Sequence, residues 1–229
     1  MPKPPSLVVL YEDNHLLVVN KPAGLATQGV IEGAPSVVTA AKEYLKKKYN
    51  KPGKVYLGVV SRLDAAVSGV LVLARTSKAA ARLTEQFRDR STEKTYWALV
   101  EQPPDPRAGQ LDHWVLKDDR AMRMRVVLPR TRGAQQARLD YRTLDTDKGR
   151  TLVEVHLHTG RKHQIRLQLA EIERPILGDR KYGSRTDFTA GIALCAVRLS
   201  IEHPTTKDRL VFQAPPPPHW KLPRGKAGS

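Results

Sequence analysis

The stretch that decides the fold is Ser61-Arg62-Leu63-Asp64-Ala65-Ala66-Val67-Ser68-Gly69, which continues directly into Val70-Leu71-Val72-Leu73-Ala74. The run from Gly69 to Ala74 is continuously apolar and contains β-branched residues, a pattern that predicts a buried central strand. The polar residues before it therefore lie on a loop at the mouth of a rigid strand, which is a scaffold that holds a side chain in place. Asp64 is a candidate catalytic carboxylate, although a loop aspartate is more often a helix cap or a solvated charge.

Two strands and a helix are predicted ahead of this loop. Leu7–Tyr11 and Leu16–Val19 are short apolar runs separated by a tight polar turn, as in a strand pair. Asn20–Gly24 (Asn-Lys-Pro-Ala-Gly) breaks the pattern with a proline and a glycine. Ser36 is predicted to cap a helix with apolar residues at helical spacing. This helix would end in Lys46–Lys48, where cations suit the helix dipole.

The rest of the chain predicts mostly strands. Seven arginines between Arg120 and Arg142 alternate with apolar residues, which indicates strands with one basic, exposed face. The prolines of residues 101–110 predict a loop. The other elements predicted are helices at 77–90 and 163–169 and strands at 95–100, 152–158, 192–199 and 210–212.

Consecutive strands that outnumber the helices favour an α+β fold. We expect a single domain with a central, largely antiparallel (mixed) sheet flanked by helices. Its expected limits are residues 7–220, between a flexible N-terminus at 1–6 and a flexible basic tail at 221–229.

The charge of the chain points to a polyanionic partner. It carries 39 Lys and Arg against 23 Asp and Glu, a net charge of +16 with a pI near 10.1. A basic protein gains affinity for nucleic acid because neutralised phosphates release their counterions. A merely solvated surface is the alternative. A membrane is disfavoured, because neither a long apolar span nor a basic segment with a bulky apolar helix face is present. The single cysteine and the lack of a signal-peptide pattern favour the cytoplasm.

Two further segments carry candidate chemistry. His158–Arg166 (His-Thr-Gly-Arg-Lys-His-Gln-Ile-Arg) is a dense cationic cluster at a helix N-terminus, a natural site for phosphates or simply a solvated basic patch. In Glu93–Val100, Tyr96 lies on a strand, where an aromatic ring packs in the core or stacks on a base.

Together these segments resemble the RluA family of pseudouridine synthases. That family has H-R-L-D-x-x-T-S-G, K-x-Y-x-A and T-G-R-x-H-Q-I-R in this order. Four more segments resemble its remaining motifs, so that the resemblance runs from about residue 7 to about residue 220: Asn20–Gly24, Arg174–Gly183, His203–Thr206 and Phe212–Pro215. Three positions depart from the family's motifs. Ser61 replaces the histidine before Arg62, and Val67 replaces the threonine before Ser68. Cys195, in Leu194-Cys195-Ala196, replaces the histidine of the family's L-H-A near the C-terminal strand.

The resemblance implies a function and roles for single residues. It implies isomerisation of uridine in ribosomal or transfer RNA, without cofactor or metal. Asp64 would act as nucleophile or base, with Arg166 as its ion-pair partner and Tyr96 stacked on the uracil. Members with an S4-like RNA-binding domain carry it ahead of this region, and the early first strand leaves no room for one. We expect a monomer. The implied substrate contacts are Arg62, Leu194, Arg161, Lys162 and Lys21.

Three other interpretations remain open. A non-catalytic RNA-binding protein on the same scaffold would need every basic residue but not Asp64. A metal-dependent hydrolase could use His156, His158 and His163, although no Asp or Glu cluster accompanies them in the sequence. A thiol enzyme would need Cys195, whose apolar neighbours indicate a buried, inert thiol instead.

Overall fold

The computed structural model describes residues 7–29 and 34–222, which form two compact units. The first unit contains the chain up to Glu93 together with Ala196–Pro217, and the second contains Lys94–Cys195 and the residues from Pro218 onward. The segments predicted to be flexible, 1–6 and nearly all of 221–229, lie outside the described residues. No helix in the described part of the chain is long and apolar enough to cross a membrane.

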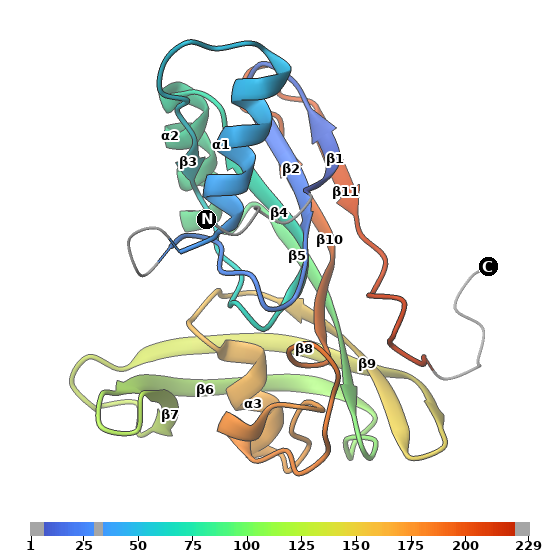
Figure 1. Ribbon diagram of the computed structural model, residues 1–229. Helices are drawn as coiled ribbons and strands as arrows, with labels where there is room; N and C mark the ends of the chain where they lie inside the picture. The colour runs from blue at the N-terminus through green and yellow to red at the C-terminus, as the bar shows by residue number, and fades with distance from the viewer. Residues whose placement is uncertain (1–6, 30–33, 223–229) are drawn as a thin grey trace. The chain divides into compact units, whose positions relative to one another are not determined.

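The first unit contains a sheet with two helices (Figure 1). The strand order is β1-β2-β4-β10, with β3 on β4 and β11 on β10, and the pairs β1–β2, β2–β4, β3–β4 and β10–β11 are antiparallel. Its strands are β1 (Val8–Glu12), β2 (Leu16–Lys21), β3 (Gly58–Val59), β4 (Ser68–Ala74), β10 (Leu194–Glu202, from Ala196 onward) and β11 (Arg209–Gln213).

Strands β2 and β4 are covered on both faces. Leu16 and Val18 pack with Leu83 of the second helix in one core cluster. Leu17 and Val19 point to the opposite face and are also fully buried. All seven residues of β4 are buried, which confirms the predicted central strand.

The two helices begin at the caps that their sequences supply. In α1 (Val37–Lys48) the Ser36 hydroxyl accepts a hydrogen bond from Thr39 N–H at 3.2 Å, as predicted. In α2 (Ser77–Arg88) the Thr76 hydroxyl does the same for Ala79 N–H at 3.1 Å. The second helix ends two residues earlier than predicted.

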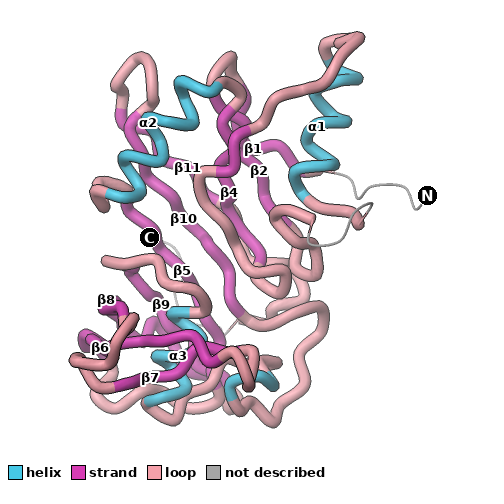
Figure 2. Tube along the Cα trace, turned by 90° about the vertical axis from the view of Figure 1, so that its left-hand side faces the viewer, coloured by secondary structure: helices cyan, strands magenta, loops and turns pink. Residues whose placement is uncertain are grey.

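The second unit contains an antiparallel sheet and one α-helix (Figure 2). The strand order is β5-β9-β8-β6-β7, and each neighbouring pair is antiparallel. Its elements are β5 (Glu93–Val100, from Lys94 onward), β6 (Ala108–Asp118), β7 (Arg123–Val127), β8 (Gln135–Asp147), β9 (Arg150–Leu157), α3 (Gln164–Glu171) and the 3-10 turn η1 (Arg180–Tyr182). The α+β class and the largely antiparallel pairing predicted from sequence are thus confirmed.

The arginine-rich stretch forms two strands with an exposed basic face, as predicted. On β7, Met124 is buried between exposed Arg123 and Arg125. On β8, Ala137 is buried and Arg138 is exposed. Met124 and Ala137 belong to the core cluster that also receives Leu167 from α3.

The prediction of a loop through residue 110 is wrong at its end, because β6 begins at Ala108. The sequence predicts no strand at 111–118 either. Only Leu111 and Val115 of this strand are buried, and a spacing of four residues fits a helix as well as a strand. The strand is specified by its two neighbours β7 and β8 rather than by its own alternation.

Candidate active site

The loop between β3 and β4 in the first unit holds Asp64. Val67 N–H donates to the Asp64 carbonyl at 3.0 Å, which closes a tight turn. Leu63 and Val67 are buried on either side of the turn, whereas Asp64 is half-buried and Arg62 is exposed. The turn therefore anchors its apolar residues and leaves the two charged side chains partly accessible to a ligand.

The Asn-Lys-Pro-Ala-Gly segment and the residues after it brace this loop through backbone groups. Gly24 N–H donates to the Ala65 carbonyl at 2.8 Å. Thr27 Oγ1 donates to the Leu63 carbonyl at 2.9 Å and accepts from Leu63 N–H at 3.1 Å. The residues on both sides of Asp64 are thereby fixed to a second segment of the chain.

Lys21 adds a third connection from inside the protein. Its side chain is fully buried, and Nζ donates to the carbonyl groups of Leu25 at 2.6 Å, Pro22 at 2.9 Å and Ala65 at 3.1 Å. Burial lowers the pKa of Lys21 to about 8, and the nearby Asp64 carboxylate opposes that shift. The resemblance assigned Lys21 to substrate contact. A buried ammonium with all three donors on carbonyl groups is better suited to holding the loop than to binding a phosphate.

Gly69 forms the rigid base of the loop at the start of β4. Its φ of +113° is a conformation that side chains rarely adopt, and a Cβ there would lie 2.3 Å from the Ala196 carbonyl oxygen on β10. Only glycine lets the two backbones approach this closely.

In the second unit, Arg166 on α3 lies in a buried ion pair. Its Nε and Nη2 donate to the two carboxylate oxygens of Asp179 at 2.7 and 2.9 Å. The guanidinium carbon also lies 5.2 Å from the ring centre of Tyr182. A bidentate pair with an aromatic ring beside it fixes the plane of the guanidinium group.

Asp179 and Tyr182 were not among the site residues named from sequence. The available signal was their place in the Arg174–Gly183 segment, which resembles a family motif. The sequence does not reveal that Asp179 holds Arg166, because 13 residues and a turn separate the two.

The turn before α3 is built from buried polar contacts. Gln164 Oε1 accepts from the Thr159 hydroxyl at 2.7 Å and from Arg161 N–H at 2.9 Å. His163 adopts a left-handed φ of 53°, and its Nδ1 lies 2.9 Å from the Tyr182 hydroxyl. These contacts set the start of α3 and hence the position of Arg166.

The remaining predicted site residues are distributed as follows. Tyr96 is half-buried on β5, and Leu194 is buried at the start of β10. Arg161 Nε donates to the Gln136 carbonyl at 2.9 Å, whereas the Lys162 side chain is exposed. Asp64 belongs to the first unit, and its pairing with Arg166 of the second stays a prediction.

The histidines of the metal-dependent hydrolase interpretation and the cysteine of the thiol enzyme interpretation do not form a common site in the described residues. His156 Nε2 lies 3.0 Å from Glu154 Oε1, and His158 Nε2 lies 2.6 Å from Asp140 Oδ2. Within residues 7–29 and 34–222 no three His, Cys, Asp or Glu side chains gather in a way that could hold a metal ion. Cys195 is fully buried, as its apolar neighbours predicted.

Similarity to solved structures shows the class of protein to which this fold belongs. The human protein RNA Pseudouridylate Synthase Domain Containing 4 is similar in structure with a TM-score of 0.77 and 28% sequence identity, over 92% of this chain and 89% of that one. The fold is therefore that of the pseudouridine synthases, isomerases that act on uridine in RNA.

Sequence comparison then defines the family. The family model described as RNA pseudouridylate synthase matches residues 15–171, and the chain belongs to this family. The dual-specificity RNA pseudouridine synthase RluA of Escherichia coli (strain K12) is 35% identical, over 93% of this chain and 95% of its own. An uncharacterized RNA pseudouridine synthase of Bacillus subtilis (strain 168), YhcT, is 33% identical, over 96% of this chain and 72% of its own.

Proposed function

We propose that this RNA pseudouridine synthase converts specific uridines of ribosomal or transfer RNA to pseudouridine with Asp64 as the reacting carboxylate. The observation that carries the proposal is the bracing of the Asp64 loop. Four hydrogen bonds with Gly24, Thr27 and Lys21 fix the backbone of Leu63 and Ala65, and yet Asp64 itself stays partly accessible. A reacting group held by rigid neighbours needs little reorganisation when the substrate arrives.

The reaction is an isomerisation. The N1–C1′ bond of the uridine breaks, the uracil turns, and a bond forms between C5 and C1′ while C5 loses its proton and N1 gains one. Atoms and electrons balance within the nucleotide, so neither an oxidant nor a group donor is consumed.

The other residues support this chemistry in distinct ways. Arg62 is exposed beside Asp64, where it would help to displace a stacked uridine from its helix. Arg166 would hold Asp64 ionised as an ion-pair partner. Tyr96 would stack on the displaced uracil, Leu194 would form an apolar wall of the pocket, and Arg161 and Lys162 would bind phosphates.

The test is the release of tritium from bulk RNA labelled at C5 of uracil. We expect release by the wild-type protein and none above background with Asp64→Asn, which keeps the shape of the side chain but not its charge. Asp89→Asn is the control, because this exposed aspartate at the end of α2 lies outside the braced loop. Release by Asp64→Asn at the wild-type rate would contradict the assignment. Binding of RNA without release by the wild type would favour the non-catalytic interpretation.

A further inference from the structure

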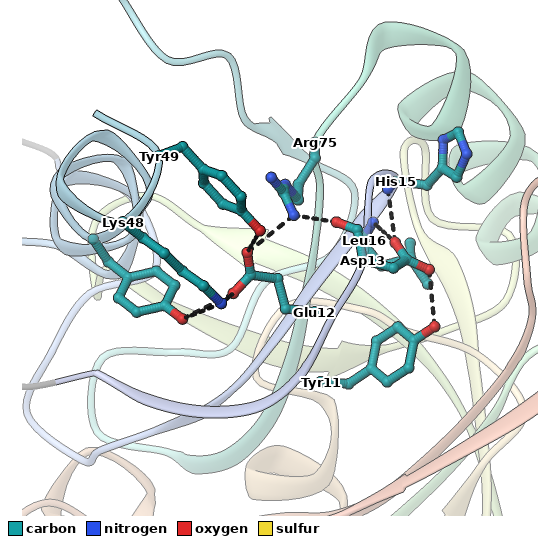
Figure 3. Close-up of polar contacts among 9 residues, drawn as sticks. Tyr11, Glu12, Asp13, His15, Leu16, Lys48, Tyr49 and Arg75 are labelled. Atoms are coloured by element: carbon teal, nitrogen blue, oxygen red, sulfur yellow. Dashed lines mark hydrogen bonds and ion pairs between the residues drawn. The ribbon is translucent and has the colours of Figure 1, made fainter. Parts of the chain in front are cut away.

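A second group of charged and aromatic residues surrounds Glu12 in the first unit (Figure 3). The Glu12 side chain is only 7% exposed and accepts hydrogen bonds from Tyr49 Oη at 2.6 Å, Lys48 Nζ at 2.7 Å, Tyr44 Oη at 2.8 Å and Arg75 Nη1 at 3.0 Å. Burial alone would raise the pKa of Glu12, but the hydrogen bonds from Lys48, Tyr49 and Tyr44 outweigh it and the pKa is lowered. The carboxylate is therefore a fixed, ionised centre that orders the groups around it.

Tyr49 is held by its hydroxyl while its ring remains exposed. Three cations lie near the centre of the ring: the guanidinium carbon of Arg75 at 4.9 Å, Lys48 Nζ at 5.6 Å and Lys51 Nζ at 6.0 Å. The residue as a whole is 45% exposed. An aromatic ring with this much exposure contributes little to the core, but a fixed ring among cations can stack on a base beside a phosphate.

The segment that contains Tyr49 is rich in lysine. Residues 46–54 contain five lysines and no acidic residue. Lys46, Lys47, Lys51 and Lys54 are all exposed, and Glu12 lies directly against Lys48 and Arg75. The buried Glu12 carboxylate thus fixes Lys48, Tyr49 and Arg75, and the lysines beside them keep the surface positively charged.

We propose that this Glu12 platform, made of Glu12, Lys46–Tyr49, Lys51 and Arg75, is a second contact surface for the substrate RNA. The lysines bind backbone phosphates and Tyr49 stacks on a base in a part of the RNA remote from the target uridine. The proposal rests on the proposed function, since it takes the Asp64 loop as the place of reaction.

The separation of the two surfaces follows from α1. The helix begins beside the braced loop, because Val37 N–H donates to the Ala26 carbonyl at 2.9 Å and the next residue, Thr27, bonds to Leu63. The platform lies at the opposite end of this 12-residue helix (Figure 1). A helix of that length spans about 18 Å. A substrate that touches both surfaces must therefore extend well beyond the nucleotide that reacts.

An RNA fits the platform better than a lipid surface does. The apolar residues Val37, Ala41 and Leu45 of α1 are buried within the protein, so that the helix offers no apolar face to acyl chains. A polar tyrosine ring between lysines matches alternating bases and phosphates instead.

The experiment compares two double variants for binding to unfractionated transfer RNA over a range of salt concentrations. Lys47→Ala with Lys51→Ala removes two exposed cations of the platform but keeps Lys48 and Arg75 on Glu12. Lys78→Ala with Arg88→Ala removes two exposed cations of α2 and is the control. The logarithm of the binding constant falls as the logarithm of the salt concentration rises. Each lost phosphate contact makes this fall less steep by about 0.7–0.9, so the platform pair should reduce the steepness by about 1.5. The control pair should leave the slope unchanged.

Substitutions of Tyr49 test the stacking. Tyr49→Phe keeps the ring and should bind RNA within about twofold of the wild type, whereas Tyr49→Ala should bind roughly tenfold more weakly. In the tritium assay the platform pair should raise KM and leave kcat unchanged.

Three results would overturn the proposal. They are an equal change of slope in both double variants, RNA binding unaffected by the platform pair, or a platform that binds vesicles of phosphatidylserine and phosphatidylcholine but not RNA. Binding needs no turnover, so the slopes can be measured in the Asp64→Asn background. A failure of the tritium assay alone would refute the proposed reaction and leave the platform as an RNA contact.

Discussion

The ammonium of Lys21 is charged in a place that water does not reach. Its pKa in the folded protein is about 8, against 10.5 in an unfolded chain. Between these two values the unfolded chain binds more protons than the folded one. The free energy of unfolding therefore rises with pH in this window.

We expect Lys21→Met to remove this dependence. Relative to the variant, the wild type should gain about 1 kcal/mol of unfolding free energy per pH unit between pH 8 and 9.5. Urea unfolding at several pH values measures this difference, and parallel pH curves for the two proteins would contradict the prediction.

The ion pair of Arg166 and Asp179 can be tested against an exposed pair in the same part of the chain. Asp179 is 1% exposed and Asp187, which pairs with Arg180, is 94% exposed. Asp179→Asn should lower the free energy of unfolding by about 3 kcal/mol, because the buried guanidinium of Arg166 would then face a neutral amide in place of a carboxylate. Asp187→Asn should change it by less than about 0.5 kcal/mol. Urea denaturation of both variants gives the comparison, and equal losses would show that burial of the pair is unimportant.

At the scale of an element, Gly69 decides how closely β4 approaches β10. Gly69→Ala combines a strained φ with a Cβ that meets the Ala196 backbone, and the expected loss of unfolding free energy is about 3 kcal/mol or more. Gly53→Ala is the control, since its Cβ would meet nothing within 4 Å. The midpoints of urea unfolding report both changes. A stable Gly69→Ala protein would mean that the two strands can separate at little cost.

Elements with a complete local signal were predicted well. The strand β4 is a continuous apolar run, and α1 has both its cap at Ser36 and its cationic end at Lys46–Lys48. The strand β6 lacks such a signal, because Leu111 and Val115 are its only buried residues and the pairing with two neighbours supplies the rest of its stability. Local pattern therefore fails where tertiary pairing determines the conformation.

At the scale of the whole molecule, the sequence predicted the α+β class and the antiparallel sheet, whereas the roles of the site residues that it names stay predictions. It did not predict which side chains meet. Glu12 gathers donors from α1 and from Arg75, 63 residues away, and Asp179 reaches back to α3. Such contacts depend on how elements pack in space, and a charged residue looks the same in a sequence whether it ends in solvent or in a buried pair.

The two units also differ in how the chain builds them. The first unit is interrupted, because β10 and β11 are supplied by Ala196–Pro217 after the second unit has been passed. During synthesis, which runs from the N-terminus, the antiparallel pair of β2 and β4 leaves the ribosome before β10, when β3 covers only Leu73 and Ala74 on the other edge of β4. Nearly all of the second unit is available before that edge is closed. An apolar strand edge without its partner can pair with other nascent chains, so we expect the yield of native protein to fall when translation between β4 and β10 is slowed.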